Sequence, residues 1–314
     1  MEYFLRTLVT GGAGFIGGHL VDALLARGAT VRIVDNFSTG RRENIAHNLD
    51  RIELIEGDIC DDALCARVTK DVDVVFHQAA LPSVARSVEA PVASNEVNVG
   101  ATVKLLDACR RNGVGRFVYA ASSSAYGDTE VLPKVETMVP QPLSPYAVSK
   151  LASENYVKVF AQLYQMKTCA LRYFNVFGPR QDPNSHYAAV VPKFCTAILS
   201  GNSPTIFGDG GQTRDFTFIE NVVQANLLAA TGDVAGQVVN VACGERISLL
   251  DLVDMINGLA GTQIKATHAP GRQGDVRHSL ADISAAKALL GFDPKVSVRD
   301  GLARTFAFYQ SQMR

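Results

Sequence analysis

A glycine-rich stretch near the N-terminus limits what this 314-residue chain can fold into more than any other feature. The short run Thr7–Thr10 leads into glycines at positions 11, 12, 14 and 17, and an apolar-periodic segment follows as far as Gly28. This order predicts a strand, a tight turn and a helix. Glycines let the backbone approach a pyrophosphate, and the free N–H groups at the start of a helix attract its negative charge. The stretch therefore predicts a phosphate-binding loop.

A carboxylate follows at the distance where a dinucleotide-binding fold places its ribose-binding acid. The run Val31–Asp35 predicts a second strand that ends in this carboxylate. Asp35 is expected to accept hydrogen bonds from the adenosine 2′- and 3′-hydroxyls and to repel a 2′-phosphate, which favours NAD over NADP. Two alternatives stay open: Asp35 could be an ordinary strand-end acid, and Arg41 and Arg42 are near enough to receive a 2′-phosphate.

Composition narrows the class of protein. Hydrophobic residues make up 47% and charged residues 19%, which is typical of a globular chain with a sizeable core. The formal net charge is −1 and neither sign clusters, so nucleic acid and anionic membranes are not expected as main partners. No apolar run approaches membrane-spanning length and no signal peptide is recognisable, so we expect a cytoplasmic protein. Neither a disulfide framework nor a metal site is expected, because the cysteines at 60, 65, 109, 169, 195 and 243 form no CxxC pair.

Strands and helices are expected to alternate through the first half of the chain. Further strands are predicted at Arg51–Ile59, Val72–His77 and Arg116–Ala121, with a helix from about Asn95 to Arg111. This alternation predicts an α/β fold with a doubly wound parallel sheet of the Rossmann type. Ligands of such sheets bind beyond the carboxyl ends of the strands.

Several residues near these strand ends are candidate cofactor contacts. The small side chains of Gln78–Ala80 would let the chain pass close to a cofactor diphosphate. Asp58 could contact adenine, although a solvated strand-end acid is nearly as good an explanation. Asn98 is either a cofactor contact or an ordinary polar residue of its helix. His77 lies on a strand that is predicted to be buried, where we expect a core histidine rather than a catalytic one.

Catalytic chemistry is expected from two motifs that follow the fifth strand. The hydroxyls of Ser122–Ser124 should lie at the ligand crevice, unless they form only a serine-rich turn. Tyr146 and Lys150 are one turn apart on a helix that begins at Pro145. An ammonium beside a phenol, together with a positive nicotinamide ring, favours the phenolate. Tyr146 is therefore expected to act as a base.

The motifs TGGAGFIG, SSSAYG, SPYAVSK and RYFNVFGPRQDP resemble those of the extended short-chain dehydrogenase/reductase superfamily, specifically its nucleotide-sugar epimerase branch. The resemblance covers essentially the whole chain and is greatest to UDP-N-acetylglucosamine 4-epimerases, which are relatives of UDP-glucose 4-epimerase. It implies reversible C4 epimerisation of a UDP-hexose through a 4-keto sugar. Tyr146 would remove the 4-hydroxyl proton and Ser122 would hydrogen-bond that oxygen. Lys150 would lower the pKa of Tyr146 and hold the nicotinamide ribose.

The same resemblance sets our expectations for the two ligands. Tightly bound NAD is expected to contact Gly11, Gly14, Phe15, Ile16, Gly17, Asp35, Asn36, Ser38, Thr39, Gly40, Asp58, Ile59, Gln78, Ala79, Ala80, Asn98, Tyr146, Lys150 and Tyr173. The UDP-sugar is expected to contact Ser83, Ser122, Ser123, Tyr146, Asn175, Ala189, Val190, Lys193, Thr205, Phe207, Arg214, Arg272, Asp275 and Ser279. The two arginines are assigned to the UDP diphosphate and Asp275 to the uridine ribose. Each residue taken separately could instead be a surface or packing residue.

Two domains are expected. Residues 1–171 would bind NAD, and residues 172–314 would mainly bind the substrate, with about 215–242 returning to the first domain. Within the second part we expect a helix from about Ala188 to Leu199 and strands at 214–219 and 238–241. No helix follows Gly208–Gly211, so a hairpin turn is predicted there rather than a second phosphate loop.

Substrate choice is expected to depend on Ser279. In related epimerases a large residue aligned here excludes a 2-N-acetyl group, whereas a small one admits it. UDP-GlcNAc and UDP-GalNAc are therefore the expected substrates, with UDP-Glc and UDP-Gal as further ones, unless Ser279 is merely a polar loop residue. Dehydration is disfavoured because the related dehydratases carry an acid pair where this chain has Ser123 and Ser124. UDP-glucuronate epimerases and decarboxylases are closer rivals.

A protein of another class, a non-catalytic nucleotide sensor with a Rossmann fold, is disfavoured because the serine, tyrosine and lysine of the motifs are all retained. The resemblance also implies a homodimer, formed through helices near residues 97–111 and 149–164. Apolar residues such as Leu105, Tyr156 and Phe160 would form its interface, or they could pack inside the subunit.

Overall fold

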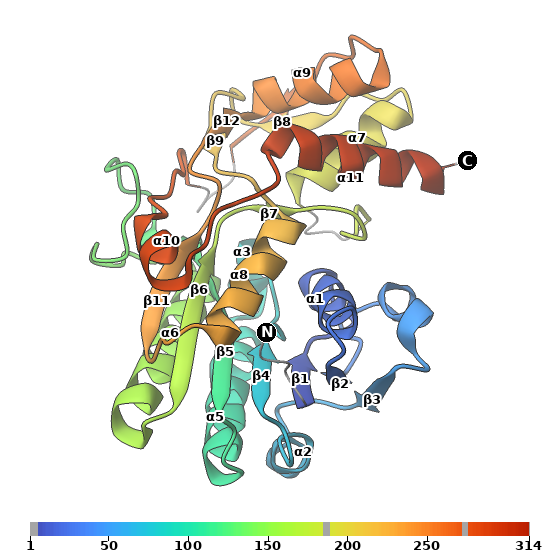
Figure 1. Cartoon of the computed structure of the whole chain (residues 1–314). Helices are drawn as coiled ribbons and strands as arrows, with labels where there is room; N and C mark the ends of the chain where they lie inside the picture. Colours follow the sequence, from blue (N-terminus) through green and yellow to red (C-terminus); the bar gives the residue numbers. More distant parts are fainter. Residues whose placement is uncertain (1–5, 185–188, 272–275, 314) are drawn as a thin grey trace.

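A seven-stranded parallel sheet forms the centre of the molecule (Figure 1). The computed structural model describes residues 6–184, 189–271 and 276–313. The strands of the sheet are β1 (Arg6–Thr10), β2 (Thr30–Asp35), β3 (Ile52–Glu56), β4 (Val74–His77), β5 (Arg116–Ser122), β6 (Lys167–Tyr173) and β11 (Gln237–Val241). Their order is β11-β6-β5-β4-β1-β2-β3, and every neighbouring pair is parallel. The predicted doubly wound α/β fold is confirmed, with the switch in strand order between β1 and β4.

Helices cover both faces of this sheet. The helices involved are α1 (Phe15–Leu25), α2 (Asp62–Val68), α5 (Ala101–Arg111), α6 (Pro145–Tyr164) and α8 (Ile219–Thr231). Leu8 and Val9 are neighbours on β1 and both are fully buried, because successive side chains of a strand point to opposite faces. Val9 belongs to a buried cluster that includes apolar residues of α1 and α8, whereas Leu8 belongs to another that includes residues of α2, α5 and α6. The sheet is therefore buried on both sides.

The turn between β1 and α1 needs glycine for steric reasons. Gly11 has φ +67°, and a Cβ there would lie 2.8 Å from the Cα of Ala79. A Cβ on Gly17 would lie 2.1 Å from the carbonyl oxygen of Gly11. These approaches bring the ends of β1 and β4 and the first turn of α1 together, as the phosphate-loop prediction requires.

The helix expected from about Asn95 to Arg111 is interrupted. It begins as α4 (Pro91–Asn95), continues as a π-helical turn (Glu96–Gly100) and ends as α5. The carbonyl oxygen of Asn98 accepts hydrogen bonds from Thr102 Oγ1 and Ser153 Oγ, each at 2.6 Å. The carbonyl oxygen of Asn98, which lies in the π-helical turn, thus accepts hydrogen bonds from side-chain hydroxyl groups.

Smaller elements complete the chain beyond β6. Three strand pairs form, which are β7 (Val176–Phe177) with β10 (Thr217–Phe218), β8 (Thr205–Phe207) with β13 (Thr267–Ala269), and β9 (Thr213–Arg214) with β12 (Ile247–Ser248). Helices α7 (Val190–Leu199), α9 (Leu249–Ala260) and α11 (Val298–Gln312) pack together at one end of the molecule (Figure 1). The remaining short helices are α3 (Val84–Glu89), α10 (Ser284–Leu290), η1 (Arg42–Asn44), η2 (Ala46–Asn48) and η4 (Ser123–Tyr126).

Two sequence predictions in this region are wrong. Gly208–Gly211 does not join a hairpin, because the strands on either side, β8 and β9, pair with β13 and β12 instead of with each other. The strand expected at 214–219 is divided into β9 and β10 around Asp215. The buried carboxylate of Asp215 accepts backbone N–H groups from Cys243, Gly244 and Ala281, which ties three segments together at that point.

Helix α6 is fixed to the sheet by a buried ion pair. Arg172 on β6 donates to both carboxylate oxygens of Glu154, at 2.8 Å and 2.7 Å, and the two side chains are 4% and 3% exposed. The guanidinium also lies 4.6 Å from the ring centre of Tyr126. Glu154 is one turn beyond Lys150, so the pair fixes the helix that carries Tyr146 and Lys150. No helix of the described residues is long and apolar enough to cross a membrane.

Candidate active site

A cavity of about 1040 Å³ lies where the loops after β1, β2, β4 and β5 meet α6. Its volume suits a ligand at the large end of the range for small-molecule sites. Of the residues expected around the cofactor, it is lined by Gly11, Gly14, Phe15, Ile16, Gly17, Asp35, Asn36, Ser38, Thr39, Gly40, Asp58, Ile59, Gln78, Ala79, Ala80, Tyr146, Lys150 and Tyr173. Of those expected around the substrate, it is lined by Ser83, Ser122, Tyr146, Asn175 and Ala189.

Asp35 is held at the end of β2 by two backbone hydrogen bonds. Its Oδ2 accepts from the N–H of Ala13 at 2.9 Å, and its Oδ1 accepts from the N–H of Phe37 at 2.8 Å. Burial raises the pKa of this carboxyl above its usual range, while the two N–H donors lower it. A carboxylate oxygen can accept more than one hydrogen bond, so both oxygens can still receive ribose hydroxyls.

The arginines that could have received a 2′-phosphate both lie beside carboxylates. Arg41 lies near the carboxylates of Glu43 and Asp182, at 3.4 Å and 3.6 Å. Arg42 pairs with Glu56 at 2.5 Å and lies over the ring of Phe37. Both guanidinium groups therefore already face carboxylates, which agrees with NAD rather than NADP.

A buried hydrogen-bond network holds Gln78 and Tyr173 beside the cavity. Asn226 of α8 accepts from Gln78 Nε2 at 3.0 Å, and its own Nδ2 donates to the hydroxyl oxygen of Tyr173 at 2.8 Å. The Tyr173 hydroxyl is also 3.2 Å from Gln78 Oε1. Asn226 was not among the expected residues, because a single amide on a helix carries no signal before the fold brings it there.

His77 is a core residue, as expected. Its Nδ1 is 2.7 Å from Thr10 Oγ1 and its Nε2 is 2.8 Å from Thr102 Oγ1. Burial, together with the nearby positive charge of Lys150, lowers the pKa of His77 to about 3. The imidazole is therefore neutral and satisfied by hydroxyl groups.

Ser122 is positioned by a neighbouring serine. Its Oγ accepts from the hydroxyl of Ser124 at 2.8 Å and from the N–H of Ser124 at 3.2 Å. Because these bonds use its acceptor capacity, the Ser122 hydrogen can point elsewhere. Burial raises the pKa of the Tyr146 phenol overall, and the nearby Ser122 hydroxyl acts in the opposite direction.

Lys150 is buried and donates to the backbone of β5. Burial lowers the pKa of Lys150 to about 7, and its Nζ donates to the carbonyl oxygen of Ala120 at 2.8 Å. The Nζ is also 5.0 Å from the ring centre of Tyr119. Burial raises the pKa of the Tyr146 phenol. The expected effect of Lys150 on this phenol, which acts together with a nicotinamide ring, stays a prediction.

A second, smaller cavity of about 130 Å³ adjoins Asn175, which lines both cavities. Besides Asn175, its expected substrate residues are Val190, Thr205, Phe207 and Arg214, and Phe194, Gln212 and Leu249 complete its lining. Ser279 is buried beside it, where its Oγ accepts from Asn175 Nδ2 at 3.2 Å and from the N–H of Asp215 at 3.3 Å.

Some expected contacts do not line either cavity. Asn98 is buried outside them and hydrogen-bonds the backbone of Leu81 and the hydroxyl of Ser149, so it positions the wall instead of lining it. Ser123 and Lys193 also lie outside the two linings. Arg272 and Asp275 lie outside the residues that the structure describes.

Gln181 and Asp182 line the larger cavity and were not expected there. Their signal was present in the sequence, since they belong to the motif RYFNVFGPRQDP that follows β6. Within the described parts of the chain, no three His, Cys, Asp or Glu side chains are grouped so that they could hold a metal ion.

Comparison with known proteins identifies the class of enzyme to which this site belongs. Residues 7–242 match the model of the NAD dependent epimerase/dehydratase family. The chain belongs to this family. It is an epimerase that uses NAD, so the expected superfamily, cofactor and isomerase chemistry are confirmed.

Relatives of this epimerase match it along its whole length and are named for different sugars. A UDP-glucose 4-epimerase of Mycolicibacterium smegmatis is 41% identical over 98% of this chain and 99% of its own. A UDP-N-acetylglucosamine 4-epimerase from Methanobrevibacter ruminantium has been solved in complex with UDP-N-acetylmuramic acid. Its sequence is 42% identical to this one, and the two structures align with a TM-score of 0.95 over 99% of this chain and 100% of that chain. A UDP-glucuronic acid 4-epimerase from Bacillus cereus, solved with UDP-glucuronic acid and NAD, is 33% identical with a TM-score of 0.91 over 99% and 100%.

Proposed function

We propose that this epimerase reversibly inverts C4 of UDP-hexoses, with UDP-GlcNAc and UDP-GalNAc as its main pair and UDP-Glc and UDP-Gal as a second pair. The observation that carries the proposal is the joint placement of Ser122, Tyr146 and Lys150 on the wall of the cavity that the glycine loop and Asp35 also line. One relative is named for UDP-N-acetylglucosamine and another for UDP-glucuronic acid, so the choice among sugars rests on the second cavity.

The residues of the larger cavity fit NAD. The backbone turn at Gly11 and Gly17 leaves no room for side chains, so main-chain N–H groups can approach a diphosphate. Asp35 keeps acceptor capacity for the adenosine ribose, and Lys150 lies where it can hold the nicotinamide ribose. Bound there, NAD would supply reversible hydride transfer at C4 of the sugar.

Three side chains take part in proton transfer at the sugar 4-oxygen. Tyr146 takes the proton from the 4-hydroxyl and returns it after the ketone has presented its other face. Ser122, whose oxygen is occupied by Ser124, donates its hydrogen toward Tyr146 or the sugar oxygen and stabilises charge there. The positive charge of Lys150 favours the phenolate when the nicotinamide ring adds its own charge nearby.

The acetamido preference is supported by Ser279 and Asn175. Asn175 lines both cavities, and its side chain donates to Ser279. Because the side chain of Ser279 is small, it leaves more room beside Asn175 for a 2-acetamido group than a bulky residue would. Arg214, which lines the second cavity, supplies a guanidinium suited to phosphate oxygens. Arg272 and Asp275 remain proposed ligands of the UDP diphosphate and the uridine ribose.

The sugar is identified by incubating the purified protein with UDP-GlcNAc, UDP-Glc or UDP-glucuronate, without added NAD, and following the products by proton NMR. We expect UDP-GalNAc from UDP-GlcNAc, at a higher kcat/KM than UDP-Gal from UDP-Glc. Conversion of UDP-Glc alone would contradict the acetamido preference but keep the chemistry. Conversion of UDP-glucuronate alone, to its epimer or to a pentose, would replace the proposed substrate with the uronate alternative.

We also propose a homodimer built on α6. Leu105 and Phe160, two of the expected interface residues, are buried within the subunit. An exposed apolar face of α6 remains, formed by Val148, Tyr156, Val159 and Leu163, which are 52%, 42%, 41% and 68% exposed. Residues spaced by three, four, seven, eight or eleven positions share one side of a helix, and an apolar side of this kind favours contact with another subunit.

Sedimentation velocity tests the dimer. Each subunit has a mass of 33.7 kDa, and we expect Leu163→Glu to convert a species of twice that mass into monomers, because a carboxylate would be buried unpaired at the contact. Leu289→Glu serves as the control, since Leu289 is an exposed leucine on α10, away from this face. A monomeric wild-type protein, or equal loss of dimer in both variants, would contradict the proposal.

The division into two domains is likewise proposed. Residues 1–171 together with about 215–242 form the NAD-binding part, which is supported by β11 pairing with β6 in the main sheet. Residues 172–314 otherwise form the substrate part, and every residue that lines the second cavity comes from it.

All six cysteines are free thiols, which supports a reducing compartment such as the cytoplasm.

A further inference from the structure

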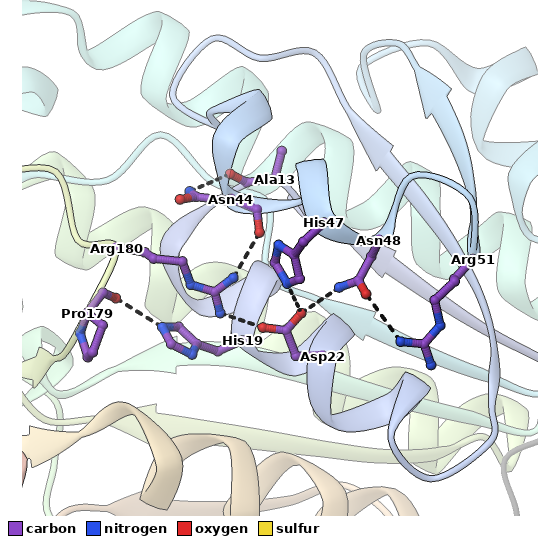
Figure 2. Close-up of polar contacts among 9 residues, drawn as sticks. All are labelled: Ala13, His19, Asp22, Asn44, His47, Asn48, Arg51, Pro179 and Arg180. Atoms are coloured by element: carbon purple, nitrogen blue, oxygen red, sulfur yellow. Dashed lines mark hydrogen bonds and ion pairs between the residues drawn. The ribbon is translucent and has the colours of Figure 1, made fainter. Parts of the chain in front are cut away.

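The loop after β7 is bound to α1 and to the segment after β2 (Figure 2). Arg180 Nη2 donates to Asp22 Oδ2 at 2.6 Å, and its Nη1 donates to the carbonyl oxygen of Asn44 at 2.9 Å. His19 Nε2 donates to the carbonyl oxygen of Pro179 at 2.9 Å, because a carbonyl can only accept. Burial and the nearby guanidinium lower the pKa of His19 to about 4, so this donor is a neutral imidazole. We name these contacts the Arg180 clamp.

The two carboxylate oxygens of Asp22 have separate partners (Figure 2). Oδ1 accepts from His47 Nε2 at 2.8 Å and from Asn48 Nδ2 at 2.6 Å, whereas Oδ2 accepts from Arg180. One oxygen therefore fixes the segment at η2 and the other fixes the loop after β7. The Arg180 side chain is only 16% exposed, which shields its ion pair from solvent more than an ordinary surface pair.

The backbone at Arg180 is held in an unfavourable conformation. Its φ is +65°, in the left-handed region that residues with a Cβ seldom adopt. Such a conformation persists where surrounding contacts fix it, and here the Arg180 clamp supplies them. The side chain of Arg180 contacts α1, while the next two residues, Gln181 and Asp182, line the 1040 Å³ cavity.

Gln181 and Asp182 also connect this loop to the loop after β2 and to the C-terminal helix α11 (Val298–Gln312). Asp182 Oδ1 lies 3.6 Å from Nη1 of Arg41, which lines the same cavity from the loop after β2. The hydroxyl of Tyr309 on α11 donates to the carbonyl oxygen of Gln181. Gln181 and Asp182 thus form part of the wall of the cavity that Phe15 of the phosphate loop also lines, and Pro179 and Arg180 lie directly before them in the chain.

We propose that Arg180 is a positioning residue that holds residues 179–182 against the bound NAD and thereby slows release of the cofactor. A cofactor that is regenerated in each turnover need never leave, so a fixed wall does not impede catalysis. The inference rests on NAD occupying the larger cavity, and it is independent of which sugar is the substrate.

Release of NAD from the purified holoprotein tests this proposal. The holoprotein is diluted, samples are desalted at intervals, and the NAD that stays bound is released with acid and quantified. Arg180→Ala should lose NAD at least tenfold faster than the wild type, while kcat at saturating added NAD stays within threefold. Arg180→Lys keeps the positive charge, but a lysine lacks the planar guanidinium that donates to Asp22 and to the carbonyl oxygen of Asn44 at the same time. Its rate of NAD release should therefore be intermediate.

Two control variants separate the clamp from general stability. His47→Ala removes a partner of Asp22 Oδ1 and leaves Arg180 paired, and Arg304→Ala breaks the exposed ion pair with Glu220 at 2.9 Å on α8. Both should release NAD within twofold of the wild-type rate. Wild-type release from Arg180→Ala, or equally fast release from Arg304→Ala, would overturn the proposal. Should Arg180→Ala not fold, Arg180→Lys with wild-type release would overturn it as well. A wild-type protein that binds no NAD would instead refute the proposed function.

Discussion

Replacement of Tyr146 by phenylalanine is expected to lower kcat for sugar epimerisation by about 10²–10⁴-fold, the usual contribution of a positioned acid or base. The ring and its packing stay, and only the oxygen that we propose to exchange a proton with the sugar 4-hydroxyl is removed. The phenol faces Ser122 in the cavity, so no other hydroxyl on α6 replaces it at that position. The rate of UDP-sugar conversion and the amount of bound NAD are both measured, and NAD binding should persist.

Tyr156→Phe is the matched control, because Tyr156 lies on the same helix but is 42% exposed and outside the cavity. It should keep wild-type kcat. If Tyr146→Phe also kept wild-type kcat, Tyr146 would not be the base. A nucleotide sensor, by contrast, would show no conversion even as wild type and would be indifferent to either change.

Replacement of Lys150 by methionine is expected to lower kcat by about 10²-fold or more and at the same time to stabilise the folded protein near neutral pH. Burial lowers the pKa of Lys150 from 10.5 in the unfolded chain to about 7 in the folded one. The folded state therefore carries a cost for a charge that the unfolded state holds freely. Removing it should raise the free energy of unfolding by about 4 kcal/mol at pH 7, less about 1 kcal/mol for the lost hydrogen bond to Ala120.

The shifted pKa of Lys150 also predicts how the free energy of unfolding changes with pH. Between pH 7 and 10.5 the unfolded chain binds more protons at this lysine than the folded chain, so wild-type stability rises with pH across that window. The advantage of Lys150→Met should therefore be greatest at or below pH 7 and shrink as the pH approaches 10.5. Urea unfolding at pH 7 and pH 9.5 measures this, with the exposed Lys287→Met as a control that should show little effect. An advantage that did not shrink with pH would contradict the explanation.

The main sheet was predictable because its signals are local. The glycine loop, the acid at the end of β2 and the alternation of strands and helices each lie within a short stretch of sequence, and their joint order allows few topologies. The hydroxyl, phenol and ammonium groups at the active site could also be placed, since strand β5 and helix α6 carry them to the same edge of the sheet.

The missed features depend on contacts between distant segments. Asn226 reaches Gln78 across 148 positions, and Arg180 reaches Asp22 across 158, so neither partner signals the other along the chain. The burial that raises the pKa of Tyr146 was not predictable for the same reason, because it depends on the segments that pack around its helix. The false hairpin at Gly208–Gly211 arose since turn residues predict a turn but not which strands will pair.

The buried pair of Arg172 and Glu154 also has a consequence for how chains of this kind can diverge. Losing either partner leaves the other as an unpaired charge in the interior, which costs about 3–5 kcal/mol, whereas exchanging both for apolar residues can be neutral. A lineage that altered one position first would pass through a form too unstable to be retained. The two positions should therefore covary, and substitution histories should show them inherited together or replaced together.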